Sequence, residues 1–123
     1  MIEVDQLTKV YGATAAIDSL SFRIEKGEIV GFLGPNGAGK TTTMRILAGA
    51  LSATSGRALI GGVDVFDQPK KVKAMVGYLP ERPPLYTDMT VRDFLRFCAR
   101  VKGAADPKPT VERIIERVGL APV

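Results

Sequence analysis

Residues 34–42 combine turn-permitting glycines with a lysine and two threonines, a set suited to holding phosphate. The segment reads Gly34-Pro35-Asn36-Gly37-Ala38-Gly39-Lys40-Thr41-Thr42. Its first eight residues match the pattern G-x-x-x-x-G-K-[ST], the P-loop. Gly34, Gly37 and Gly39 are expected to take backbone conformations closed to residues with a Cβ. Successive N–H groups can then point inward and form a nest for an anion.

The side chains of this loop predict how a nucleotide with Mg²⁺ would be held. Lys40 supplies a full charge for the β- and γ-phosphates, and the Thr41 hydroxyl is placed to ligate Mg²⁺. Thr42 adds a further donor near the phosphates, and the dipole of the following helix favours negative charge at the same point. Charge-assisted hydrogen bonds of this kind contribute roughly 1.5–3 kcal/mol each. The alternative is a plain glycine turn before a helix.

The segments on either side of the loop support the P-loop interpretation. Residues 28–33 are short and mostly apolar, as a strand covered on both faces would be. From 40 to 51 the pattern becomes helical, because Met44, Leu47, Ala48 and Leu51 recur at helical spacing. A strand, a glycine-rich loop and a helix in this order are the context that the motif requires.

Alternation and apolar runs predict further strands. They cover residues 2–5, 19–24, 57–60, 63–66 and 75–79. The early strands lie close together in sequence, so they are expected to pair as an antiparallel sheet. The later ones alternate with helices, which favours a parallel α/β sheet.

Three further helices are expected. Asp67 is a candidate cap for a short helix over 68–74. Thr90 and Asp93 have capping-box spacing. The helix that they begin would place four residues on one face, with the Cys98 thiol buried in a structural role: Val91, Phe94, Leu95 and Cys98. A loop over 103–109 precedes a last helix that ends at Gly119, and its apolar face comprises Val111, Ile114, Ile115 and Val118.

Composition excludes several classes of function. The 123 residues, 46% apolar and 24% charged, fit one globular domain. The absence of histidine and the single cysteine exclude Ser-His-Asp and Cys-His catalysis and histidine-containing zinc sites. No apolar run approaches the ~20 residues of a membrane span, and no signal-peptide pattern opens the chain. Residues 69–123 carry eleven basic and six acidic side chains, which fits solvated helices, with nucleic acid, a membrane surface or an acidic partner as alternatives.

At this point the sequence resembles the ATP-binding cassette (ABC) transporter ATPases. The matching segments are LTKVYG at 7–12, GPNGAGKTTTMRILAG at 34–49, SATSG at 52–56, YLPE at 78–81 and DMTVRDFL at 88–95. They cover essentially the whole chain in the family's order and look most like bacterial exporter, drug-resistance and gliding-motility ATPases. The resemblance implies an α/β fold: a P-loop NTPase core with an N-terminal antiparallel β-subdomain and the beginning of a helical subdomain, in an incomplete domain. The core and β-subdomain would cover about 1–80 and the helical part about 81–123.

The resemblance also implies ligands and partners. ATP and Mg²⁺ are the expected cofactors, with Tyr11 stacking on adenine beside the phosphate-binding residues 34–42. Tyr11 as an ordinary loop aromatic is the alternative. Glu81 stands where most members carry the Q-loop glutamine, which implies a metal-side role, whereas a plain solvent-exposed acid is the alternative. A transmembrane permease subunit would dock near 82–96, a second ATPase subunit would bind head to tail, and no nucleic acid partner is expected. The resemblance implies a cytoplasmic location, peripheral on the cytoplasmic face of the cell membrane.

Other family motifs have no match in this sequence. No serine follows Ser55, so the LSGGQ-type signature is absent, and no acidic residue after Lys40 follows four apolar residues, as the Walker B motif requires. A switch histidine is also absent. The expectation is the N-terminal part of one nucleotide-binding domain, which binds ATP without hydrolysing it efficiently alone. A self-associating module without catalytic activity is the alternative, and the SATSG and DMTVRDFL words disfavour another P-loop enzyme such as a kinase or GTPase.

Overall fold

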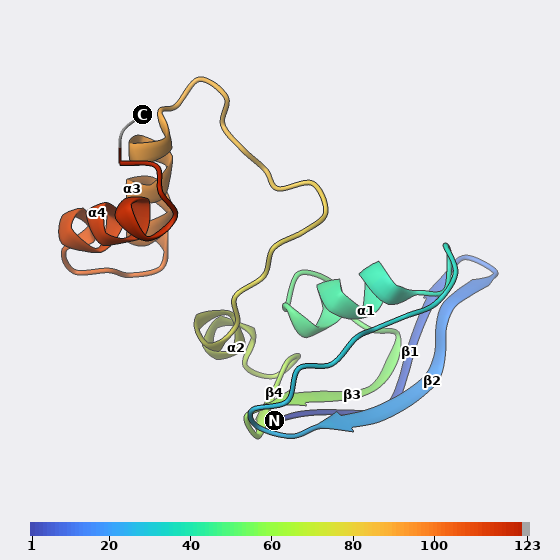
Figure 1. The fold of residues 1–123 in the computed structure, drawn as a ribbon. Helices are drawn as coiled ribbons and strands as arrows, with labels where there is room; N and C mark the ends of the chain where they lie inside the picture. Colours follow the sequence, from blue (N-terminus) through green and yellow to red (C-terminus); the bar gives the residue numbers. More distant parts are fainter. Residues whose placement is uncertain (122–123) are drawn as a thin grey trace. The chain divides into compact units, whose positions relative to one another are not determined.

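The computed structural model describes residues 1–121 and divides the chain into two compact units, Met1–Tyr78 and Leu79–Val123 (Figure 1). The first unit contains a sheet, the P-loop and two helices, and the second contains two helices. No helix within residues 1–121 combines the length and apolarity needed to cross a membrane.

A four-stranded antiparallel sheet organises the first unit. Its order is β2-β1-β3-β4. The strands are β1 (Ile2–Tyr11), β2 (Thr14–Ile24), β3 (Ser55–Ile60) and β4 (Val63–Asp64). The antiparallel pairing expected of the early strands is therefore confirmed. The first two strands are longer than predicted, because Gly12 (φ 57°) allows a tight turn that joins them into one hairpin.

Aliphatic side chains join this sheet to helices α1 (Lys40–Leu47) and α2 (Pro69–Met75). Leu7 and Ala58 from the sheet, Ile46 from α1 and Val72 from α2 are all 0% exposed. Since each buried methylene contributes about 0.8 kcal/mol, this cluster is the main source of stability in the unit.

The prediction of a parallel sheet is wrong, because two of the strands that it required do not form. Residues 28–33 have no regular structure, and the Ile29 and Leu33 side chains are exposed rather than covered. The segment 75–79 is not a strand either, because α2 continues to Met75 and the residues after it are irregular. A strand needs a neighbour for its backbone N–H and C=O groups, and no strand within residues 1–121 pairs with either segment.

Three local boundaries also differ from the predictions. The predicted strand 63–66 ends at Asp64, whose carboxylate accepts hydrogen bonds from the N–H groups of Phe66 (2.8 Å) and Asp67 (3.3 Å). Asp67 does not cap α2, since the N-cap residue is Gln68. Helix α1 ends at Leu47 rather than 51, because Gly49 (φ 66°) closes it in a left-handed conformation.

The second unit consists of α3 (Val91–Val101) and α4 (Pro107–Arg117), preceded by an irregular segment. The predicted cap at Thr90 is confirmed, because Thr90 Oγ1 accepts from the Asp93 N–H at 3.2 Å. The Asp93 carboxylate accepts from the Thr90 hydroxyl at 2.7 Å rather than from its backbone N–H, so the contact differs from a full capping box. Helix α4 begins inside the predicted loop 103–109, where Asp106 caps the Lys108 N–H. It ends before Gly119 (φ 73°), as predicted.

Fewer apolar side chains are buried in this unit than the apolar patterns of the two helices predicted. On α4, Val111 and Ile115 are buried, whereas Ile114 and Val118 are exposed. No residue of α3 is fully buried, so the expectation of a buried Cys98 is wrong and its side chain is half-buried. Ring contacts supplement this packing, because Tyr86 lies 6.1 Å from Phe94 and 5.8 Å from Phe97 between centroids.

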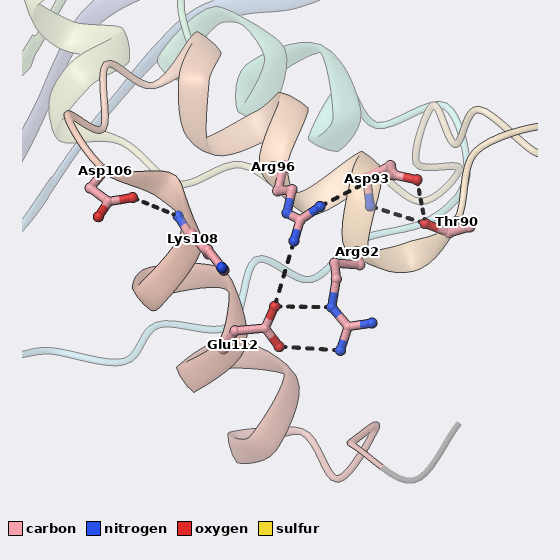
Figure 2. A network of polar contacts seen from close by, with 7 residues as sticks. All are labelled: Thr90, Arg92, Asp93, Arg96, Asp106, Lys108 and Glu112. Carbon is pink, nitrogen blue, oxygen red and sulfur yellow. Dashed lines mark hydrogen bonds and ion pairs between the residues drawn. The ribbon is translucent and has the colours of Figure 1, made fainter.

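Ion pairs bridge the two helices of the second unit. Arg92 donates to both carboxylate oxygens of Glu112, at 3.0 and 3.2 Å, and Arg96 lies 3.9 Å from the same carboxylate (Figure 2). The hydrogen bond from Arg92 lowers the pKa of Glu112 although desolvation opposes it. These ion pairs join α3 and α4, where few apolar side chains are fully buried.

Candidate functional site

The glycine-rich loop over residues 34–39 leads directly into α1, and its backbone takes the conformations that glycine allows at two positions. Gly37 and Gly39 have φ of 85° and 81°. The prediction that Gly34 also takes such a conformation is wrong, because its φ lies outside the left-handed region. The loop therefore needs glycine for its backbone conformation at the residues nearest the helix.

Gly39 has a second reason to lack a side chain, since it packs on the β1–β2 hairpin. A Cβ on this residue would overlap the carbonyl oxygen of Ala16. In the hairpin Lys9 pairs with Ile17 and Val10 pairs with Ala15, so Ala16 is the extra residue of a β-bulge. The bulged residue is thus the point at which the hairpin contacts the end of the loop.

The Lys40 ammonium lies against the first two residues of the same loop. Nζ donates hydrogen bonds to the carbonyl oxygens of Gly34 and Pro35, both at 2.6 Å. These contacts hold its charge close to the loop rather than extended into solvent. An ammonium with three donors in this place is suited to phosphate oxygens.

The start of α1 suits an anion for a second reason. The N-cap Gly39 makes no side-chain hydrogen bond, and the first turn contains no acidic residue. The first N–H groups of a helix have no partner within it, so an anion can accept from them. The residues present therefore fit a nucleotide phosphate, and they include Thr41, with its exposed side chain, and the half-buried Thr42.

Thr43 is a supporting residue that sequence reasoning missed. It is 1% exposed, and both its N–H (2.8 Å) and its hydroxyl (2.9 Å) donate to the carbonyl oxygen of Gly39. It thereby fixes the last glycine of the loop on the first turn of α1. The run of three threonines after Lys40 was the available signal.

Tyr11 ends β1 at the same end of the hairpin as Ala16. It pairs with Thr14 across the turn, and 49% of its surface is exposed. The Lys9 Nζ lies 5.1 Å from the centroid of its ring. Since Gly39 packs on Ala16, the hairpin end that bears Tyr11 is also the surface against which the glycine-rich loop is held. Sequence reasoning gave Lys9 no role, although its position two residues before Tyr11 on a strand was visible.

Glu81 belongs to the second unit, where it is exposed in the irregular segment before α3. Its metal-side role stays a prediction. Within residues 1–121, no group of three or more histidine, cysteine, aspartate or glutamate side chains is arranged to hold a metal ion. Mg²⁺ at a nucleotide site takes much of its coordination from phosphates and water, so the Thr41 hydroxyl suits it without such a group.

Comparison with known proteins gives consistent matches. The profile of the ABC transporter family matches residues 17–123. The chain is 40% identical to the probable multidrug ABC transporter ATP-binding protein YbhF of Escherichia coli, over 98% of this chain and 21% of that protein. It is 38% identical to the bacitracin transport ATP-binding protein BcrA of Bacillus licheniformis, over 98% of this chain and 39% of that one.

Solved structures agree in fold. The ATP-binding subunit of an ABC transporter superposes with a TM-score of 0.76 at 32% identity, over 86% of this chain and 44% of that one. A dimeric bacterial ABC transporter cassette has a TM-score of 0.81 at 24% identity, over 94% of this chain and 55% of that one, which is evidence for the fold alone. The predicted α/β fold with an antiparallel β-subdomain is confirmed. The chain spans less than half the length of these two curated relatives, YbhF and BcrA.

Proposed function

The chain belongs to the ABC transporter family, and we propose that it binds Mg-ATP through residues 34–42 as the phosphate-binding part of a transporter's ATP-binding subunit. The observation that carries the proposal is the position of Lys40. Its ammonium lies on the carbonyl oxygens of Gly34 and Pro35, beside a helix start without acidic or capping side chains. This arrangement concentrates positive charge where a polyphosphate would lie.

The residues of the loop have distinct tasks in this proposal. Lys40 exchanges its two carbonyl partners for phosphate oxygens, and the N–H groups at the start of α1 donate to the same anion. The Thr41 hydroxyl would hold Mg²⁺, which when bound would supply positive charge opposite the phosphates. Thr43 and the contact between Gly39 and Ala16 keep the loop in place. Tyr11 provides an exposed ring for the adenine base.

Transport coupling extends this proposal to the whole protein. The relatives include a bacitracin transport protein and a probable multidrug transporter, which supports export across a membrane. We expect the residues of this chain to bind ATP but to hydrolyse it poorly alone, because they include no Walker B acid and no signature motif. A second ATPase subunit is expected as a partner, as the sequence resemblance implies.

A permease subunit is the expected partner of residues 82–96. Within the second unit Leu85 and Tyr86 are 61% and 54% exposed. A depression of about 490 Å³ adjoins the start of α3, and Thr90, Arg92 and Leu120 contribute to its lining. Exposed apolar side chains and a depression whose lining is largely apolar support a protein partner. A metal-side role for Glu81, just before this segment, stays a prediction.

Calorimetric titration with Mg-ATP tests the nucleotide site. Lys40→Ala removes charge-assisted hydrogen bonds to phosphate, so affinity should fall about 10- to 100-fold. Lys71→Ala is the matched control, because Lys71 is an exposed lysine of the same unit on α2. Equal affinity of the Lys40 variant and the unchanged chain would reject the proposed site.

A self-associating module is the second candidate function. It is favoured by the unpaired segment 28–33, in which Ile29 is 102% and Leu33 is 94% exposed. Exposed apolar residues on an extended, unpaired segment are prone to association. Light scattering during the same titration separates the two candidates. A nucleotide-independent dimer that binds no Mg-ATP would favour the module.

A further inference from the structure

We propose that Lys9 is a positioning residue for base recognition, which sets the Tyr11 ring so that one face is free to stack on a purine. The inference rests on the proposed function, because it concerns the base of the nucleotide whose phosphates the loop would bind. It adds a residue for which neither the motif pattern nor the sequence resemblance gave a role.

The geometry places Lys9 and Tyr11 on the same face of β1, since they are two residues apart on a strand. The Lys9 Nζ lies 5.1 Å from the ring centroid, within the ~6 Å range of a cation–π contact. Within residues 1–121 no carboxylate forms an ion pair with this ammonium. The ring of Tyr11 is therefore the partner that the structure gives to the Lys9 charge.

The contact has two consequences for stacking. An ammonium over one face of the ring leaves the opposite face for another flat group, and 49% of the Tyr11 surface is exposed. The cation also draws electron density from the ring, which favours stacking with an electron-rich purine. A tyrosine at a hairpin end would otherwise turn about its side-chain bonds, so a fixed ring loses less entropy when the base binds.

Strand pairing fixes the backbone of Lys9 within the hairpin. Lys9 pairs with Ile17 at the edge of the bulge formed by Ala16, and Ala16 contacts Gly39 of the phosphate-binding loop. The residue that orients the ring is thus attached to the same hairpin segment that supports the loop. This arrangement fixes the base-binding and phosphate-binding groups relative to one shared element.

A charge near a nucleotide could also act simply by attracting phosphate, and the experiment separates the two roles. Mg-ATP and inorganic tripolyphosphate with Mg²⁺ are titrated into the unchanged chain, Lys9→Met and Lys9→Arg, with calorimetry as the readout. Methionine keeps the aliphatic part of the side chain, whereas arginine keeps the cation. Lys71→Met is the control for loss of one exposed positive charge on the same unit, and circular dichroism checks that each variant folds.

We expect Lys9→Met to weaken Mg-ATP binding about two- to five-fold and to leave tripolyphosphate binding unchanged. Lys9→Arg should restore Mg-ATP affinity, because guanidinium also lies well over an aromatic face. In the Tyr11→Leu background, Lys9→Met should have no further effect on Mg-ATP, because its partner ring is gone.

Three results would overturn the role of Lys9. An equal loss for both ligands would show a general charge effect, and unchanged Mg-ATP affinity would show that the ring needs no positioning. Tighter Mg-ATP binding by Lys9→Met would show that the ammonium occupies the face that the base requires. Failure of the proposed function would differ from all three, because the unchanged chain would then bind neither ligand, and both proposals would be rejected.

Discussion

The first unit, Met1–Tyr78, is stabilised by contacts between residues far apart in sequence, and the second, Leu79–Val123, by contacts between adjacent helices. In the first, β1 pairs with β3 across the intervening strand β2, a loop and helix α1, and side chains from the sheet, α1 and α2 share one core. In the second, α3 has no fully buried residue, and α3 and α4 are joined by exposed ion pairs.

This difference fits what each unit is proposed to do. A phosphate site has to keep its donors in fixed places, because positioning accounts for much of phosphate binding and chemistry. The loop is accordingly attached to a buried core through Thr43 and to the hairpin through Gly39. A docking surface needs exposed apolar groups instead, and the second unit provides them at Leu85 and Tyr86.

The sharpest test of the comparison is the same truncation made in both units. Leu7 is 0% exposed in the core of the first unit, whereas Leu95 on α3 is only half-buried. Leu7→Ala should lower the free energy of unfolding by about 2–5 kcal/mol, because it leaves a cavity as well as losing buried surface. Leu95→Ala should cost clearly less.

Hydrogen exchange, resolved by peptide, measures the two variants within their own units. Faster exchange in β1 and β3 is expected for the Leu7 variant, and only a modest change in α3 for the Leu95 variant. An equal cost for both truncations would contradict the comparison, since it would mean that α3 is packed as tightly as the sheet.

The features that sequence reasoning predicted correctly depend on short-range patterns. The strand alternation gave the antiparallel hairpin, and capping spacing gave the start of α3 at Thr90 and the end of α4 at Gly119. The order of loop and helix over 34–47 was also predictable, because the motif and the helical period lie side by side in sequence.

The predictions that failed depend on contacts with residues far away in sequence, which a local pattern does not specify. Residues 28–33 have strand composition, but pairing decides whether a strand forms, and within residues 1–121 nothing pairs with them. The contact of Gly39 with Ala16 was equally hidden, because it needs a bulge in a strand more than twenty residues earlier. The cation over the Tyr11 ring required the side-chain geometry as well as the strand period.

A smaller effect is expected at the one well-shielded carboxylate that joins elements of the first unit. The Asp64 side chain is 11% exposed and accepts from Arg57 at 2.9 Å and from the Phe66 N–H. Asp64→Asn removes the charge from these bonds, so the free energy of unfolding at pH 7 should fall by about 1–3 kcal/mol. Asp67→Asn is the matched control, because its side chain is exposed.

The pH dependence of this effect has a defined sign. Burial opposes ionisation of Asp64, but the hydrogen bonds from Phe66, Arg57 and Asp67 outweigh it and lower the pKa below the ordinary value of 3.8. A lowered pKa in the folded state adds stability that is fully present above 3.8 and is lost as pH falls through the folded value. Urea unfolding should therefore separate the unchanged chain from Asp64→Asn at pH 7 and bring them together in strong acid. A constant difference at every pH would assign the effect to shape rather than charge.

The smallest effect is expected where the second unit relies on exposed charge. Arg92 and Glu112 are about half and a third exposed, and solvent and salt screen such pairs. Arg92→Ala should lower the melting temperature of the second unit slightly at low salt, and the difference should disappear in 1 M sodium chloride. Arg113→Ala on α4 is the control, because Arg113 is exposed and has no ion pair within residues 1–121. A large, salt-independent loss for Arg92→Ala would show that its aliphatic stem packs between the helices, and the second unit would then resemble the first in being stabilised by burial.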